Sequence, residues 1–529
     1  MRLKHSWVIA LFLVGCQSTP TEDTAKTSVP TNKNTSSSKQ DSKNKRLFER
    51  SPATARKAFQ AQPEALTAQE QADLWDRIVL QFRLPIPENE RVDYYRRWYL
   101  DHPEHLDIVA KRADPFLYLI TEKIEQRGLP LELALLPVVE SSFDAFAYSK
   151  GSAAGLWQFI PSTGRLYGLK QNYWYDGRRD VNAATDAALK YLSNLGKRFK
   201  GNWPQAIAAY NSGEGRVYRA IKTNKANGKP TDFFSLSLPA ETTDYVPKLL
   251  ALADVLAQRE KYGLTLPAID NEPQLELVRP GEQLDLAIAA KYAEISVKEL
   301  ESYNPGYNRW ATAPSGPHSL LLPIDSVDTF NDNLASHKGE GLHLVRYQVK
   351  SGDTLSEIAS RYRTTTQVIK NANQLDSNTI RIGQYLLVPK SIQDASTYAL
   401  SAQNRLKATQ SKSQGQYKLS HVVQRGESLW TIAKHHNVSY QSLAKWNGLG
   451  PKDTLRTGQS LVVWKKGQPG SVIRRVSYQV KSGDTLSEIA VKFKVNRSDI
   501  VQWNNLHQQK YLQPGQDLKL YVDVTKVSV

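Results

Sequence analysis

The sequence has almost no cysteine: of its 529 residues, only Cys16 carries a thiol. A single thiol can form no internal disulfide, and it supplies no set of cysteine ligands for zinc. The chain also lacks a base-reading helix motif and an aromatic-stacking signature for nucleic acid. We therefore expect no metal site, no cofactor and no nucleic-acid partner.

Acidic residues are in deficit, since 52 Asp and Glu stand against 69 Lys and Arg and leave a formal net charge of +17. A basic surface favours anionic partners such as a cell-wall polymer or a lipid head group. The alternative is that much of the excess lies in solvated linkers, which the lysine-rich stretches 39–57 and 407–418 support. Charge alone leaves both interpretations open.

The N-terminus lacks an apolar run long enough for a mature membrane helix, because Trp7–Val14 is too short to span a bilayer. This run ends in Leu13-Val14-Gly15-Cys16, which resembles the lipobox of bacterial lipoproteins. The resemblance implies a signal peptide over residues 1–15 and lipidation of Cys16. Because no aspartate follows the cysteine, it also implies an outer-membrane anchor facing the periplasm of a Gram-negative bacterium. An ordinary signal peptide with an incidental cysteine is the alternative.

Aromatic residues are scarce between Gln17 and Glu64, where Ser, Thr, Lys, Asn and Gln dominate. Such a composition buries too little apolar surface to fold. We predict that residues 16–70 form a disordered, lipidated tether that lets an anchored protein reach the cell wall.

Helical periodicity begins at about residue 71 and continues to about residue 265. Apolar and aromatic residues recur there at three- and four-residue spacing, which predicts an all-α domain. Asp180 and Asn202 are suited to cap two of the helices. The expected helices include 73–82, 91–99, 114–126, one that follows Asp180, 204–210 and 241–260.

One glutamate of this domain, Glu140, has the surroundings of a general acid. Pro130 suits the first position of a helix, and Pro137 is expected to kink or end that helix. Glu140 would then lie in its last turn, where the helix dipole and apolar neighbours such as Phe143 raise the pKa of the carboxyl. A carboxyl that holds a proton near neutral pH can protonate a glycosidic oxygen. From this stretch alone, a solvated glutamate is the simpler alternative.

Four short motifs in a fixed order strengthen the first interpretation. They are Glu140-Ser141, Gly155-Leu156-Trp157-Gln158, Ala209-Tyr210-Asn211 and Glu241-Thr242-Thr243-Asp244-Tyr245-Val246. Together they resemble the catalytic domain of lytic murein transglycosylases of the Slt and goose-lysozyme-like group, and the residues around the first two resemble the membrane-bound D branch of these enzymes. The resemblance implies a lysozyme-like fold with a substrate groove.

The same resemblance implies a one-carboxylate mechanism. Most glycosidases use two carboxylates, and no second one is obvious near Glu140. In the family, the glutamate protonates the oxygen that links N-acetylmuramic acid to N-acetylglucosamine. It then takes a proton from the muramic C6 hydroxyl, which attacks its own C1 and forms a 1,6-anhydro end. An intramolecular hydroxyl has a high effective concentration and can compete with water.

Further roles follow from the matched positions. Tyr210 would hydrogen-bond Glu140 or the N-acetyl group of the substrate, and Glu241 would lie near the sugar. For Asn211 and Tyr245, a packing role and a functional role are equal alternatives. The substrate-binding residues implied by the resemblance are Ser141, Gln158, Tyr210, Asn211, Glu241 and Tyr245.

The C-terminal part of the chain is repetitive. Tyr347–Ala359 and Tyr478–Ala490 have the same letters, and His421–Ala433 is a diverged third copy. Each unit predicts strand, helix, helix, strand and resembles LysM domains, small βααβ modules that bind glycans containing N-acetylglucosamine. We place these units at 343–390, 419–465 and 476–523, with a linker at 391–418.

In the LysM family, the glycan is contacted by the first turn and by the loop before the last strand. Asn373, Asn447 and Asn504 recur near that loop, although each is equally suited to cap a helix end. The contact residues implied for the first turns are Gly352, Asp353, Thr354, Leu355, Gly426, Glu427, Ser428, Leu429, Gly483, Asp484, Thr485 and Leu486.

A weaker match to the same pattern covers Glu272–Asp325, with Asn304 at the position of the repeated asparagine. We predict a degenerate LysM-like unit that packs on the helical domain, with an unrelated α/β appendage as the alternative. The chain is therefore expected to be multidomain: an all-α lysozyme-like domain, then βααβ LysM modules joined by flexible linkers.

The expected function is cleavage of peptidoglycan glycan strands by a lytic transglycosylase held to the wall by its LysM units. Two alternatives stay open: a lysozyme-type muramidase that hydrolyses the same bond, and a non-catalytic peptidoglycan-binding scaffold. The sequence names no protein partner.

Overall fold

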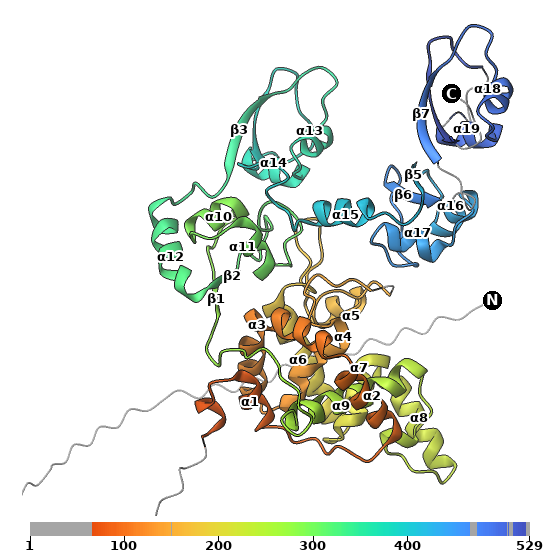
Figure 1. Cartoon of the computed structure of the whole chain (residues 1–529). Helices are drawn as coiled ribbons and strands as arrows, with labels where there is room; N and C mark the ends of the chain where they lie inside the picture. Colours follow the sequence, from red (N-terminus) through yellow and green to blue (C-terminus); the bar gives the residue numbers. More distant parts are fainter. Residues whose placement is uncertain (1–65, 150, 466–472, 505, 507–510, 525–529) are drawn as a thin grey trace, which may run out of the picture. The chain divides into compact units, whose positions relative to one another are not determined.

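A computed structural model describes residues 66–149, 151–465, 473–504, 506 and 511–524 (Figure 1). The predicted signal peptide, Cys16 and most of the predicted tether lie outside these residues. Within the described part of the chain, no helix is both long and apolar enough to cross a bilayer.

Residues 68–257 form the predicted all-helical domain. Its long central helices are started by side-chain caps, with Asp180 accepting the N–H of Ala183 and Asn202 accepting that of Gln205. Helix α9 packs on α2 and α7, and α7 also packs on α6 and α8. Its elements are η1 (Ala68–Glu70), α1 (Leu74–Val79), α2 (Glu90–Asp101), α3 (Pro103–Glu125), η2 (Leu131–Leu135), α4 (Leu136–Ser141), α5 (Pro161–Leu166), α6 (Val181–Arg198), α7 (Trp203–Ser212), α8 (Glu214–Ala226), η3 (Phe233–Ser235) and α9 (Ala240–Ala257).

The predicted LysM-like unit has the order strand, helix, helix, strand, and its two strands pair antiparallel. It continues past the expected end at Asp325 into an additional helix. Its core is shared with the helical domain, since Trp174 packs edge-on against Trp310 and the N–H of Asp176 donates to the carbonyl of Gly306. The elements are β1 (Leu275–Val278), α10 (Leu286–Tyr292), α11 (Val297–Tyr303), β2 (Leu320–Pro323), η4 (Ile324–Ser326) and α12 (Val327–Ser336).

Three further units each pair two antiparallel strands and carry two short helices between them (Figure 1). Capping boxes start the first helix of each, at Thr354, Ser428 and Thr485. The elements are β3 (His343–Gln348), α13 (Leu355–Arg361), α14 (Thr366–Ala372) and β4 (Tyr385–Lys390); β5 (Tyr417–Val422), α16 (Leu429–His435), α17 (Tyr440–Trp446) and β6 (Ser460–Lys465); and β7 (Ile473–Gln479), α18 (Leu486–Lys492), α19 (Arg497–Trp503) and β8 (Asp517–Asp523).

The segment 391–418, expected to be a linker, is partly ordered by packing. It contains helix α15 (Ala402–Ser411), and Tyr398 before this helix is buried. The Tyr398 hydroxyl donates to Asp285 over 2.8 Å, and the N–H of Leu400 donates to Glu301 over 2.8 Å. Composition alone suggested a flexible segment, because the two acids that hold it lie about a hundred residues earlier.

Candidate active site

Glu140 lies in the last full turn of α4, as predicted, but the helix is built differently. Residues 131–135 form a 3-10 helix, and Pro130 precedes it in an extended conformation. Pro137 stands in the first turn of the new helix α4, and not near the end of a longer one. A proline is tolerated there because its missing N–H would have no helical partner.

The chain turns sharply after Glu140. Ser142 and Phe143 both adopt positive φ angles, of 51° and 57°, which side chains other than glycine rarely take. Their N–H groups donate back to the carbonyls of Val138 and Pro137, and Phe143 is buried in the core. The turn therefore ends the helix directly beyond the carboxyl and leaves Glu140 half-buried at its edge.

A groove of about 640 Å³ opens at Glu140. Of the residues predicted to bind substrate, Gln158, Tyr210, Asn211 and Glu241 line this groove together with Glu140. The other residues that line the groove are Ser149, Gly151, Ala153, Phe159, Ile160, Thr163, Tyr191, Ser212 and Gly213.

Tyr245 holds the carboxyl of Glu140. Its hydroxyl donates to Oε1 of Glu140 over 2.6 Å, and its ring is buried in α9. Tyr210, which was expected to make this bond, donates instead to the carbonyl of Trp157 over 2.8 Å. The expected bond from Tyr210 to Glu140 is therefore not formed, because the Tyr210 hydroxyl is taken by the backbone of the loop that precedes α5. The alternative contact of Tyr210 with the N-acetyl group of the substrate stays a prediction.

Two other predicted residues take up structural positions. The Ser141 hydroxyl donates to the carbonyls of Pro137 and Leu156, and Ser141 is not among the residues that line the groove. Asn211 lines the groove, but it stays within α7 and accepts a hydrogen bond from the Thr242 hydroxyl over 2.8 Å. Asn211 thereby joins α7 to α9.

The electrostatics of the groove favour a protonated Glu140. Burial raises the pKa of its carboxyl to about 7, the Tyr245 hydroxyl lowers this pKa, and the negative charge of Glu241 raises it. Burial also holds the pKa of the Tyr245 and Tyr210 hydroxyls well above the ordinary value, so both stay protonated donors. A carboxyl with a pKa near the working pH can both give and take a proton.

The wall of the groove also depends on Gln158 and on a row of tyrosines. Gln158 has a positive φ of 47°, and its amide donates to the carbonyl of Gly155. The ring of Tyr191 packs in a tilted arrangement against two other rings, with its centre 5.3 Å from that of Tyr210 and 4.9 Å from that of Tyr167. The sequence could have indicated Tyr191, because it follows Ala184 on α6 by seven residues, about two helical turns, and therefore lies on the same face of the helix.

Gly155 is required for the loop beneath this wall. It has a φ of 78°, and a Cβ at this position would lie 2.1 Å from the carbonyl oxygen of Arg178. The nearby acids have structural roles, because Asp176 forms ion pairs with Arg178 and Arg179, and Asp180 caps α6. The predicted cap at Asp180 is thereby confirmed.

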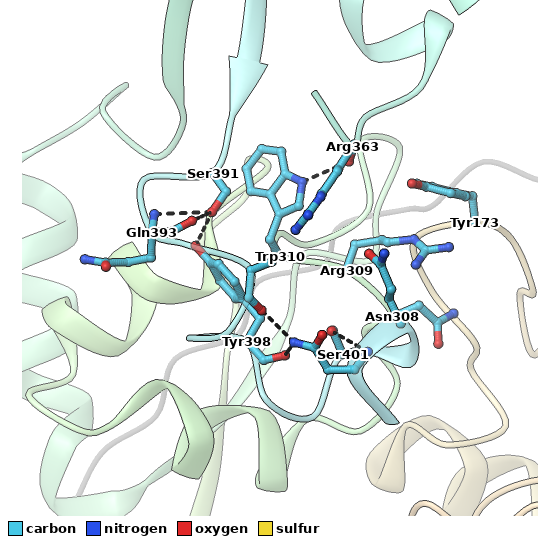
Figure 2. Close-up of a pocket in the computed structure, with 12 residues that line it drawn as sticks. Tyr173, Asn308, Arg309, Trp310, Arg363, Ser391, Gln393, Tyr398 and Ser401 are labelled. Carbon is cyan, nitrogen blue, oxygen red and sulfur yellow. Dashed lines mark hydrogen bonds between the residues drawn. The ribbon is translucent and has the colours of Figure 1, made fainter. Parts of the chain in front are cut away.

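A second pocket, shown in Figure 2, lies outside the groove. Arg309 stacks over the ring of Tyr173 at 3.9 Å, and the indole N–H of Trp310 donates to the carbonyl of Arg363. Its twelve lining residues include no carboxylic acid and no histidine. In the described residues, no three His, Cys, Asp or Glu side chains are placed to hold a metal.

The LysM asparagines clamp each unit. In the second repeat, the Asn447 amide donates to the carbonyls of Leu443 and Val462 and accepts the N–H of Val462. Asn304, Asn373 and Asn504 make the same three bonds in their own units. They are therefore clamps between the second helix and the last strand, which explains their recurrence.

The first turns expose fewer of the predicted contact side chains than expected. Leu355 and Leu429 are buried in the cores of their repeats, and Leu486 is partly buried against its own core. The turn acids point inward, as when Asp353 accepts the hydroxyl of Tyr347 and the N–H of Lys350. Solvent is reached by the glycines and by the capping residues, which are Gly352, Gly426, Gly483, Thr354, Ser428 and Thr485.

Comparison with known families agrees with this architecture. The family "Transglycosylase SLT domain" matches residues 118–233, "LysM domain" matches 347–389, 421–464 and 478–520, and "Lytic transglycosylase MltD, LysM-like domain" matches 274–339. The last match covers the predicted degenerate unit together with α12. It supports the LysM-like interpretation over an unrelated appendage.

Individual relatives extend this picture. Membrane-bound lytic murein transglycosylase D of Escherichia coli (strain K12) is 41% identical over 407 residues, which cover 74% of this chain and 86% of the relative. A putative tributyltin chloride resistance protein of Alteromonas sp. (strain M-1) is 42% identical over 169 residues, covering 32% of this chain and 80% of the relative. The solved lytic transglycosylase Slt from Pseudomonas aeruginosa is 24% identical, with a TM-score of 0.24 and coverage of 37% of this chain and 32% of that one.

Proposed function

Because this chain belongs to the family of membrane-bound lytic murein transglycosylase D and is a lytic transglycosylase of peptidoglycan, we propose that Glu140 is its catalytic acid and base. The observation that carries the proposal is the position of Glu140 in the groove, with a pKa raised to about 7 and one oxygen held by Tyr245. The bond cleaved is the β-1,4 link from N-acetylmuramic acid to N-acetylglucosamine.

In the first step, the protonated Glu140 donates its proton to the glycosidic oxygen as the bond from this oxygen to muramic C1 breaks. The N-acetylglucosamine side leaves as an alcohol, and Glu140 becomes a carboxylate. The Tyr245 hydroxyl stabilises that carboxylate, because hydrogen bonds to an ionised acceptor are stronger than bonds to a neutral one.

In the second step, the carboxylate of Glu140 removes the proton from the muramic C6 hydroxyl. The C6 oxygen bonds to C1, which forms the 1,6-anhydro ring and returns Glu140 to its protonated form. No water is consumed. We assign groove contacts with the sugars to Gln158, Tyr210, Asn211 and Glu241, and a positioning role to Tyr245.

We infer that the remaining parts bring the groove to its substrate. The signal peptide would occupy residues 1–15, and a tether from lipidated Cys16 to residue 70 would anchor the protein in the outer membrane. The catalytic domain would occupy 71–265, the LysM-like unit 272–325 with the added α12, and the LysM repeats 343–390, 419–465 and 476–523. These repeats would bind the glycan near their first turns.

The deciding experiment is mass analysis of the fragments released from purified sacculi. We expect muropeptides with anhydro ends, each lighter by one water than the hydrolysed product, and none from Glu140→Gln. Reducing muramic ends would instead establish a lysozyme-type hydrolase. Binding to sacculi without release of fragments would establish a scaffold.

The anchor has a separate test. Labelled fatty acid should be incorporated into the wild-type protein and not into Cys16→Ser, which should appear in the soluble periplasm. Equal incorporation into both proteins would contradict lipidation of Cys16.

A further inference from the structure

Each LysM repeat has a small cluster of side chains where its first strand, first turn and first helix meet. In the first repeat, the Tyr347 hydroxyl donates to Asp353 over 2.6 Å and accepts a hydrogen bond from Arg361 over 2.6 Å. The ring of Tyr362 packs edge-on against Tyr347 at 5.8 Å. The cluster thus holds the turn through an acid, a tyrosine, a base and a second aromatic ring.

The third repeat has nearly the same set. The Tyr478 hydroxyl donates to Asp484 over 2.7 Å, and the Lys492 ammonium lies 4.9 Å from the centre of the Tyr478 ring. Phe493 packs edge-on against Tyr478 at 5.2 Å. Tyrosine, arginine and lysine keep one protonation state throughout the neutral pH range.

In the second repeat, all three of these positions are histidine. His421 replaces the first tyrosine, His435 the base and His436 the second aromatic ring, and Glu427 is the acid of the turn. His421 and His436 pack edge-on at 5.0 Å, in the same way as the aromatic pairs of the other repeats. Histidine is the side chain whose charge ordinarily changes between pH 5 and 8.

The hydrogen bonds define which ring nitrogens carry protons. Glu427 is a carboxylate that can only accept, so Nε2 of His421, at 2.8 Å from it, is the donor. Nδ1 of His421 is then an acceptor, and it receives the Nε2 proton of His436 over 3.0 Å. Nδ1 of His436 is left without a proton, buried and without a partner.

The surroundings of His436 offer no partner for an additional proton, because its Nδ1 is buried without a hydrogen-bond partner. On His436, which is 3% exposed, it would create a buried cation. The charged and titratable groups that face His436 are His421, His435, Lys465 and Glu427, of which only Glu427 is negative.

We propose that the second LysM repeat is a pH-sensitive module, whose first turn and first helix loosen as the pH falls through the histidine range while the other two repeats keep their structure. The predicted loosening of the fold is inferred from this histidine cluster and does not depend on the proposed function. Its consequence, weaker glycan binding by the Gly426–Leu429 turn at acidic pH, rests on the proposed function.

The sign follows from proton linkage. Burial, together with the nearby His421, His435 and Lys465, lowers the pKa of His436 to about 3. The folded repeat therefore keeps this ring neutral where the unfolded repeat protonates it. The repeat has its full stability above the ordinary histidine pKa and loses stability as the pH falls toward about 3. For each proton that only the unfolded repeat binds, the unfolding constant rises by up to about tenfold per pH unit.

Hydrogen–deuterium exchange on the full chain tests the fold, with the first and third repeats as internal controls. Exchange at about pH 7.5 and about pH 5 is corrected for the intrinsic effect of pH and compared for helices α13, α16 and α18. We expect the opening constant of α16 to rise at least about tenfold more than those of α13 and α18. Parallel changes in all three helices would overturn the proposal.

Exchanging the clusters is the matched control. His421→Tyr, His435→Arg and His436→Tyr together give the second repeat the set of the first, and should remove its pH response. If this triple variant does not fold, the reverse change in the first repeat (Tyr347→His, Arg361→His and Tyr362→His) should confer the response on α13. The assignment to this cluster would be contradicted by a pH response that persists in the triple variant of the second repeat. It would also be contradicted if the reverse triple variant of the first repeat showed no pH response.

Binding is measured separately, with Glu140→Gln protein to prevent digestion. Retention on purified sacculi at about pH 5 and about pH 7.5 should fall with acid for the wild-type second repeat and change less after the triple exchange. If α16 loosens and retention does not change, the inference about glycan binding fails, but the inference about the fold stands.

Discussion

The groove of the helical domain depends on side chains that occur once, whereas the LysM repeats use the same side chain in several copies. The groove depends on one carboxyl, and the groups that tune it, Tyr245 and Glu241, also occur once. The repeats use the same asparagine clamp three times, and a fourth time in the LysM-like unit. A function built on single groups should be abolished by one substitution, and a function built on copies should only be weakened.

Glu140→Gln should have the largest effect. Loss of the acid and base should lower the release of anhydro fragments by roughly 10²- to 10⁴-fold or more. The exposed Glu276→Gln on β1 is a matched control that should keep full activity. A Glu140→Gln protein that retains substantial activity would place the catalytic acid elsewhere.

The same variant has a stability signature. The pKa of Glu140 is raised to about 7, so the stability that its protonated form contributes is present below the ordinary glutamate pKa and is lost as the pH rises through about 7. Glutamine does not ionise. In thermal unfolding, the melting temperature of Glu140→Gln relative to that of the wild type should therefore be higher above about pH 7 than at about pH 5.

Tyr245→Phe should have the next largest effect, because it removes the hydrogen bond that lowers the pKa of Glu140. Turnover should fall by about tenfold, and the alkaline limb of the pH–rate profile should move to higher pH. Tyr210→Phe is the comparison, since its hydroxyl bonds the Trp157 carbonyl and should leave that limb in place. If instead Tyr210→Phe moves the limb and Tyr245→Phe does not, the tyrosine expected from sequence is the correct one.

Glu241→Gln should move the same limb in the opposite direction. Its negative charge raises the pKa of Glu140, so its removal should shift the limb to lower pH by less than about one unit. An unchanged limb would show that the charge of Glu241 is screened in solution.

Asn447→Ala should have the smallest effect on activity. It leaves a buried N–H and two carbonyls unpaired, which should destabilise the second repeat by about 1–3 kcal/mol in unfolding measurements. Release of fragments from sacculi should fall less than twofold, because two other repeats remain. A loss as large as that from Tyr245→Phe would mean that the repeats act as one unit and not as copies.

Much of the fold was predictable because it depends on local signals. Asp180 and Asn202 cap their helices as expected, and Thr354 and Thr485 form capping boxes with residues three positions later. The internal repeat predicted the strands and helices of the LysM units. These features depend on residues within a few positions of each other, where side-chain chemistry and backbone geometry are directly linked.

The interior of the site was less predictable. Pro137 was expected to end a helix and instead begins one, because residues 131–135 wind as a 3-10 helix. Segment 391–418 was expected to be flexible, but Asp285 and Glu301 bind part of it. In both cases the outcome depends on packing partners that the local pattern does not contain.

By itself, the sequence determined that residues 71–265 are helical and where the βααβ units repeat, since both follow from periodicity, caps and repeated motifs, and its ordered motifs led to the proposal that Glu140 carries the chemistry. Only the tertiary structure decided that Tyr245, and not Tyr210, reaches Glu140. The two hydroxyls are equivalent in a sequence motif, and which one meets a carboxyl at least seventy residues away is set by how α4, α7 and α9 pack together.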